Sequence, residues 1–213
     1  MARRAWQSSI SSHAFLSSGS MCAECASKPA AGGRRKAMGV PCQAGPVKLF
    51  CGLIYRDEED FRAARAMLEG EFGRVELEAG PMPFNFTTYY EKEMGSNLLR
   101  RFLGFERLVD PGTLSSVKLR TNEMERLLAG RRRESAGRVV NIDPGYLDGA
   151  RVVLATTKDR AHRIYAGLGI YAEVTLLYRD GAWRPLEWTY PDYRTAEYLG
   201  FFASLRAAFL SRA

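Results

Sequence analysis

Two kinds of hydrophobic pattern alternate along the chain from Pro46 onward. Runs that are almost wholly apolar, or that alternate apolar with polar residues, predict β-strands, whereas apolar residues three and four positions apart predict helices. By the first criterion, strands are expected at Val47–Tyr55, Arg74–Glu78, Arg100–Leu108, Val139–Ile142, Val152–Thr157, Ile170–Tyr178 and Trp183–Leu186. The run Gly80-Pro-Met-Pro predicts a turn, because both prolines remove a backbone donor, and Asp180-Gly181 predicts a tight hairpin.

Three helices are expected between and after these strands. The first has Asp57 as its N-cap and ends at Gly73, and the second begins at Asp110-Pro111. The last begins near Thr195. The resulting order is β-α-β-β-α-β, then a meander, then a closing helix. It predicts an α+β fold with a mainly antiparallel or mixed sheet and helices packed on one side. The first half could be a ferredoxin-like unit.

Residues 1–45 show no hydrophobic period and are rich in Ser, Ala, Gly and Arg. We expect them to be a disordered basic extension, and residues 46–213 to be a single domain. The Arg- and Ser-rich composition is also found in organelle transit peptides, but an over-extended gene start, with Met38 or Met21 as the true first residue, explains it more simply. The segment holds six basic residues and one acidic residue, which is +5 of the net charge of +7. Because most of the excess charge lies there, the basic composition is weak evidence for a polyanionic partner.

Several classes of site and location are disfavoured by missing patterns. Cys22-x-x-Cys25 is half of a zinc knuckle whose second half is absent. The sequence has no Gly-x-x-x-x-Gly-Lys-Ser/Thr phosphate loop, and Gly167-Leu-Gly169 lacks the third glycine of a dinucleotide fingerprint. Cys51 is expected to be a buried small hydrophobe. No stretch approaches the roughly 20 apolar residues that span a bilayer, and the first 20 residues are too polar for a secretory signal, so we expect a cytoplasmic protein without membrane contacts.

Polar residues with useful chemistry gather at the ends of predicted strands, where a rigid scaffold usually presents a site. Asn141 and Asp143 precede Pro144-Gly145, a pair expected to form a sharp turn that exposes the carboxylate. The other candidates lie after a buried strand, inside an apolar strand, and between two tyrosines. They are Lys158, Asp159, His162 and Arg163, then Glu173, and then Asp192.

These residues suggest distinct roles. A carboxylate such as Glu173 is costly to bury unless it is paired, so we expect it to meet Lys158, Arg163 or a metal ion, either as a structural ion pair or as part of a functional site. Asp143, His162 and Glu173 are the candidate acid–base groups, and Asp143, Glu173 and Asp192 could form an oxygen-rich Mg²⁺ site. The candidate ligand-binding residues are Asn141, Lys158, Asp159, Arg163 and Asp192. Together they predict an enzyme or binding domain for a small anionic ligand that is nucleotide-like or phosphorylated.

Two other functions remain open at this point. Arg131–Arg133, Arg138 and the aromatic stretch Phe84–Tyr90 could bind RNA, although a solvated helix end and a packed aromatic loop explain the same residues. Alternatively, the protein is a structural or interaction protein whose polar pairs only fix strand register.

Several sequence pieces together resemble one known family. They are Val47–Tyr55, Tyr89–Gly95, Val140–Tyr146, Ala155–Asp159, His162–Tyr165, Gly169–Leu176 and Trp188–Tyr193. These pieces are similar to the bacterial family catalogued as domain of unknown function 4416, and the resemblance runs from about Pro46 to Arg194. It implies no established activity, substrate or cofactor. Members of that family generally begin close to the first strand, which favours treating residues 1–45 as an extension.

Overall fold

The computed structural model describes residues 41–131 and 137–212. The chain separates into two units, Met1–Gln43 and Ala44–Ala213, and the second contains every helix and strand discussed below. The expectations for the basic extension, its possible start sites and the Cys22–Cys25 pair lie outside the described residues. No helix within the described ranges is long and apolar enough to cross a membrane.

The described part of the domain is built on one eight-stranded sheet with the order β2-β3-β1-β4-β5-β7-β6, in which β8 also pairs with β7. All neighbouring strands are antiparallel. The strands are β1 Val47–Tyr55, β2 Val75–Pro83, β3 Leu99–Val109, β4 Val140–Leu147, β5 Arg151–Thr156, β6 Ile164–Gly167, β7 Ile170–Arg179 and β8 Ala182–Pro185.

The first half of the chain has the predicted ferredoxin-like arrangement. Helix α1 (Glu58–Phe72) connects β1 to β2, and α3 (Leu114–Ala129) connects β3 to β4. These four strands lie in the spatial order β4-β1-β3-β2, and each neighbouring pair is antiparallel. The short helix α2 (Glu91–Met94) is inserted between β2 and β3. The prediction of an α+β fold is therefore confirmed.

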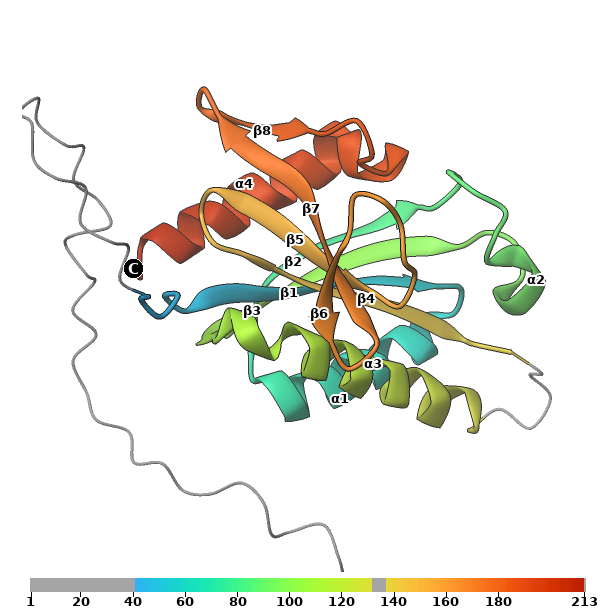
Figure 1. Ribbon diagram of the computed structural model, residues 1–213. Helices are drawn as coiled ribbons and strands as arrows, with labels where there is room; N and C mark the ends of the chain where they lie inside the picture. Colours follow the sequence, from blue (N-terminus) through green and yellow to red (C-terminus); the bar gives the residue numbers. More distant parts are fainter. Residues whose placement is uncertain (1–40, 132–136, 213) are drawn as a thin grey trace, which may run out of the picture. The chain divides into compact units, whose positions relative to one another are not determined.

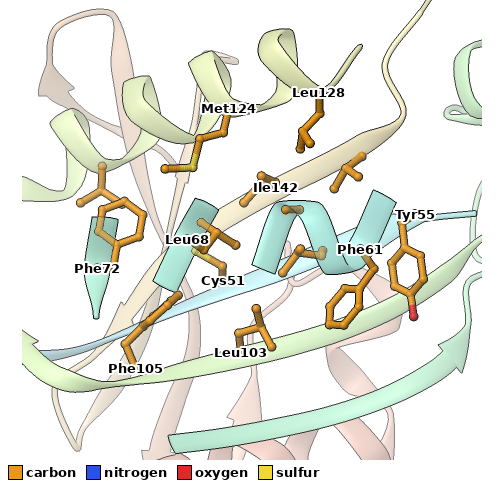
Figure 2. Close-up of a cluster of buried hydrophobic side chains, with 14 of the residues drawn as sticks. Cys51, Tyr55, Phe61, Leu68, Phe72, Leu103, Phe105, Met124, Leu128 and Ile142 are labelled. Carbon is orange, nitrogen blue, oxygen red and sulfur yellow. The ribbon is translucent and has the colours of Figure 1, made fainter. Parts of the chain in front are cut away.

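Helices cover both faces of the sheet (Figure 1). Helices α1 and α3 pack on one face through a core that includes Leu68, Met124 and Ile142 (Figure 2). Cys51 is part of this core, as expected, and burial raises the pKa of its thiol. Helix α4 (Ala196–Leu210) packs on the opposite face, where Phe202 and Leu205 meet Phe50 and Phe102. Helices were expected on one side of the sheet. The structure has them on both sides, because the closing helix α4 covers the face opposite α1 and α3.

Two predictions about local structure need correction. Gly80-Pro-Met-Pro is not a turn after the second strand, because β2 continues through it to Pro83 with a register shift between Ala79 and Met82. The prolines are tolerated there because β2 pairs only with β3 and its outer edge needs no donors. The expected meander is also more complex, since β5 pairs with β7, and β6 forms an additional hairpin with β7.

Candidate ligand-binding site

The sheet opens into a fork between β4 and β5, and the candidate residues lie around it. These strands pair from Gly145 to Leu147, so among residues 41–131 and 137–212 no strand lies beside the first half of β4 on that side. A side chain on Gly145 would collide with the carbonyl oxygen of Val153, which explains the glycine where the strands converge. The predicted turn at Pro144-Gly145 is wrong, because β4 runs straight through it and Asp143 lies within the strand. Pro144 has no N–H to leave unpaired at the open edge.

Helix α3 supplies the hydrogen bonds that β5 does not make with β4. Lys118 Nζ donates to the carbonyl oxygen of Ile142 at 2.7 Å, and the Ile142 N–H donates to Glu125 Oε1 at 2.7 Å. Lys118 Nζ also lies 3.7 Å from Asp143 Oδ1. The fork thus lets charged side chains from the α3 face reach the strand that carries Asp143.

Arg100 is the centre of one set of contacts on the α4 face. Its side chain is 3% exposed, with Nη1 at 3.4 Å from Asp143 Oδ2 and Nη2 at 3.2 Å from Asp192 Oδ2. Asn141 Nδ2 donates to the same Asp143 oxygen at 2.8 Å, and Arg138 Nη1 donates to Asn141 Oδ1 at 2.6 Å. We call Arg100, Asp143, Asp192 and Asn141 the Arg100 group.

Room for the buried guanidinium comes from a glycine. Gly52 on β1 pairs with Phe102 on one side and Asp143 on the other. A Cβ atom at Gly52 would lie 2.7 Å from Arg100 Nη1 and 2.9 Å from the Phe102 ring. The guanidinium also lies near the rings of Phe102, Phe84, Tyr193 and Tyr198, at 5.3 to 6.0 Å from their centroids. Arg100 is therefore held by both charge and aromatic packing.

A second set of contacts surrounds Glu173 on β7, whose side chain is 2% exposed. Glu173 Oε2 accepts from Arg163 Nε at 2.8 Å and lies 3.1 Å from His162 Nε2. Arg163 also donates to Tyr190 Oη at 2.7 Å and to the carbonyl oxygen of Lys158 at 2.8 Å. We call Glu173, His162, Arg163 and Tyr190 the Glu173 group. The expectation that Glu173 is paired with a cation is confirmed, and the cation is Arg163.

Aromatic side chains connect the two groups and border them. Tyr190 is two residues before Asp192, so one short segment contributes to both groups. Burial raises the pKa of Tyr90, whose charged neighbours are Asp143, Arg100 and Arg138, with Tyr190 also close enough to interact electrostatically. Tyr89 packs edge-on against Tyr90, and Lys158 Nζ lies 4.3 Å from the Tyr89 ring centroid. Trp188 stacks on the His162 ring. We call the two groups together with Lys158, Tyr89 and Trp188 the site cluster.

The predicted residues occupy different depths within this cluster. Asn141, Glu173 and Asp192 are buried, whereas Lys158 and Asp159 are exposed on the connection between β5 and β6. Asp143 is between these extremes, with 26% of its side chain exposed. Asp159 therefore belongs to the rim. The side chains of Arg100, Arg163 and His162 contact carboxylates. The described side-chain contact of Lys158 is instead with the aromatic ring of Tyr89.

The carboxylates are not arranged as a metal site. Asp143 and Asp192 share Arg100, and Glu173 is occupied by Arg163 and His162. In residues 41–131 and 137–212, no group of three or more His, Cys, Asp or Glu side chains is close enough to hold a metal ion. The predicted Mg²⁺ site at Asp143, Glu173 and Asp192 thus finds no support in the geometry.

Burial changes the proton affinity of two carboxyl groups in and beside the cluster. Burial raises the pKa of Asp192 above its usual value, Arg100 opposes that shift, and Asp143 adds to it. Burial also raises the pKa of Glu125, against the opposing effect of Lys118. These groups therefore hold protons more readily than exposed carboxyl groups do.

Sequence reasoning missed Arg100, Lys118, Glu125 and Trp188. Arg100 precedes Phe102 by two residues, so period-two alternation already places it on the buried face of β3. Lys118 and Glu125 fall on the helical period of Leu114, Thr121 and Leu128, which are all buried. A charged residue at a position that the period predicts to be buried was the criterion applied to Glu173. It would have identified Arg100, Lys118 and Glu125, but not Trp188, which is uncharged and 39% exposed.

Comparisons with known proteins identify the family. A search among curated proteins and a search among solved structures each found no match. The family model described as "Domain of unknown function (DUF4416)" matches residues 45–209, which is most of the chain. It includes every residue of the site cluster. The chain therefore belongs to the DUF4416 family.

Proposed function

We propose that the site cluster binds a small anionic ligand, nucleotide-like or phosphorylated, in the bacterial cytoplasm, either for binding alone or for catalysis. One observation carries this proposal. Buried polar side chains from β3, β4, β7 and the segment before α4 meet beside exposed aromatic rings and the exposed Lys158. Buried polar networks are costly unless fully paired, and here the network ends at accessible groups.

The contacts suggest how the work is divided within the site. Lys158 would contact the anion, because it is exposed and its side-chain contact among the described residues is with the Tyr89 ring. Arg163, which was expected to contact the anion as well, is instead occupied by Glu173, Tyr190 and the Lys158 carbonyl. Arg163 is therefore proposed as a positioning residue that holds the Lys158 loop against β7.

A catalytic version of the site would use groups that can carry a proton and reach a ligand. His162 is partly exposed and faces Glu173, which would fix the orientation and tautomer of the imidazole. Asp143 is the other partly exposed group, and Asn141, Arg100 and Lys118 hold its carboxylate in place. The proposed roles are proton transfer by His162 and acid–base or orienting contacts by Asp143.

Isothermal titration calorimetry of the full chain against inorganic phosphate, sugar phosphates and mononucleotides tests the proposal. Lys158→Gln should weaken binding of any ligand found by about 10-fold, since one charge-assisted contact is worth roughly 1.5–3 kcal/mol. Arg62→Gln is the matched control, because Arg62 is also an exposed cation, lies on α1 and is not part of the site cluster. Equal affinities for the wild type and Lys158→Gln would refute the proposed anion contact.

RNA binding is a second candidate, and one observation favours it. Two cations lie over the aromatic stretch, with Arg138 Cζ at 5.8 Å from the Tyr90 centroid and Lys158 above Tyr89. Arg131 is exposed, whereas Arg132 and Arg133 lie outside the described residues. This function predicts affinity that falls steeply with salt. It also predicts a loss on Tyr89→Leu, and unchanged RNA affinity in that variant would eliminate it.

A further inference from the structure

Trp188 is a rigid aromatic ring held at the surface beside the Glu173 group. Its Nε1 donates to the carbonyl oxygen of Val174 at 2.8 Å. The His162 ring stacks on it, with centroids 5.4 Å apart and an interplanar angle of 11°. The residue nevertheless remains 39% exposed. Its position is thus fixed on one side by a hydrogen bond and a stacked ring, and part of the indole is left open to solvent.

A ring fixed in this way loses little conformational freedom when another ring stacks on it. Tyr190 is a second such ring, since it is 44% exposed while its hydroxyl is held by Arg163. Large aromatic side chains are usually buried for the area they contribute. Two exposed and anchored rings next to buried polar residues therefore favour a planar ligand over a purely structural role.

The anion contact is connected to these rings by a short chain of hydrogen bonds. Arg163 holds Tyr190 with Nη2 and the Lys158 carbonyl with Nη1, while its Nε reaches Glu173, which in turn contacts His162 under Trp188. We call the exposed rings of Trp188 and Tyr190 the aromatic platform. The Arg163 guanidinium therefore helps to position both this platform and the Lys158 loop. A ligand that used both would carry a planar ring and a negative charge in one small molecule.

We propose that the ligand is a mononucleotide whose base stacks on Trp188 and whose phosphate contacts Lys158. This inference rests on the proposed anion-binding function and names the ligand class for the same site. A single phosphate fits the charge distribution better than a polymer does, because Arg100, Arg138 and Arg163 already contact carboxylates. A polyanion would need several cations free to replace counterions along its backbone.

The test compares three probes on the wild-type full chain by calorimetry, namely AMP, ribose 5-phosphate and inorganic phosphate. AMP should bind about 10-fold more tightly than ribose 5-phosphate, since its base can stack on an aromatic ring and ribose 5-phosphate has no base. Trp188→Leu should remove this difference, whereas Trp188→Phe, which keeps a ring, should retain most of it. Circular dichroism of both variants checks that the fold is intact.

The outcomes separate this inference from the function on which it rests. Equal affinity for AMP and ribose 5-phosphate would overturn the base platform and leave the anion site standing. An AMP preference that survives Trp188→Leu would also overturn the platform. Absence of binding for all three probes at millimolar concentration would overturn the inference and the proposed function together. Tighter binding of a single-stranded RNA oligonucleotide than of AMP, with steep salt dependence, would overturn the inference in favour of RNA.

Discussion

Two polar networks lie on the α4 face at opposite ends of β1, and they are built differently. Gly52 and Ile54 of β1 pair with Asp143 and Arg100 at the site cluster. Lys48 lies in the second network, about 13 Å from Gly52 and about 20 Å from Ile54 at a rise of roughly 3.3 Å per residue. We call Lys48, Glu76, Glu106 and Arg212 the C-terminal ion network. Helix α4 connects the two, since Asp192 precedes it and Arg212 follows it.

The C-terminal ion network closes on itself. Glu76 forms ion pairs with Lys48 and with Arg212, and Arg212 Nη1 also donates to the carbonyl oxygen of Glu106 at 3.0 Å. These contacts tie the C-terminal end of α4 to β1, β2 and β3. The exposed charges of this network, Arg212 and Glu106, pair with each other. In the site cluster the exposed groups are Lys158, whose described side-chain contact is the Tyr89 ring, and the rings of Tyr190 and Trp188. The comparison therefore sets a network whose exposed charges are paired within it against a candidate binding site.

The largest expected contrast is between Arg100→Met and Lys48→Met. Arg100→Met leaves Asp192 buried without its cation and should lower the free energy of unfolding by about 3–5 kcal/mol. Lys48→Met should cost at most about 2 kcal/mol, because Glu76 keeps Arg212 and an apolar side chain replaces a buried charge. Urea denaturation of both variants measures the difference. Similar losses would show that the two networks do not differ in this way.

A smaller contrast is expected between two glycine substitutions on the same face. Gly52→Ala pushes against Arg100 and Phe102, whereas Gly104→Ala pushes against Leu205 in the core below α4. Each should destabilise the protein by roughly 1–3 kcal/mol through overpacking. Only Gly52→Ala should also weaken ligand binding, because it displaces the guanidinium that holds Asp143. Equal ligand affinity in both variants would show that the position of Arg100 does not affect ligand binding.

The two networks should also respond oppositely to acid. Because the folded-state pKa of Asp192 is raised, its contribution to stability increases as pH falls through that pKa. Glu106 has a lowered pKa, caused first by the hydrogen bond from Arg74, so its contribution is present above the unfolded-state pKa and is lost as pH falls. Between pH 7 and pH 4, Asp192→Asn should therefore lose more thermal stability than the wild type, and Glu106→Gln should lose less. Thermal melts at the two pH values measure both changes, and the reverse order would contradict the assignment.

The smallest expected effect is that of salt on the C-terminal ion network. The Arg212–Glu106 and Arg74–Glu106 pairs are exposed, and exposed pairs contribute roughly 0.2–1 kcal/mol and are screened by salt. Arg212→Gln should therefore lose part of its low-salt effect on stability at 1 M NaCl, and the part that remains should come from its pair with the less exposed Glu76. It should leave the affinity of any ligand unchanged at either salt concentration. A loss of ligand affinity would connect the two networks through α4.

Local patterns predicted most of the fold. The bounds of β1 match the predicted Val47–Tyr55, and the Asp180-Gly181 hairpin has the positive φ angles that its turn type requires. The strand β6 was missed because its residues Ile164–Ala166 are exposed, so no burial period marks it. Pro144-Gly145 predicts a turn because both residues are common in turns. The strand tolerates Pro144 because β4 pairs there with β1 and not with β5, which is a property of the tertiary structure.

The candidate site was predicted in part. The cost of an unpaired buried carboxylate predicted that Glu173 meets Lys158, Arg163 or a metal ion, and the structure shows that the partner is Arg163. It also places Asn141, Asp143 and Asp192 together around Arg100. The fork between β4 and β5 could not be predicted, because it depends on how two strands diverge after Gly145. Lys118 and Glu125 compensate for that divergence, so their role appears only once the fork is known.

A crystal structure of the full chain grown with saturating AMP would show whether the site cluster binds a mononucleotide. We expect electron density for the nucleotide with its base against Trp188 and its phosphate within hydrogen-bonding distance of Lys158 Nζ. Density for AMP at another surface, or an unoccupied site cluster at a concentration where calorimetry shows full binding, would contradict it.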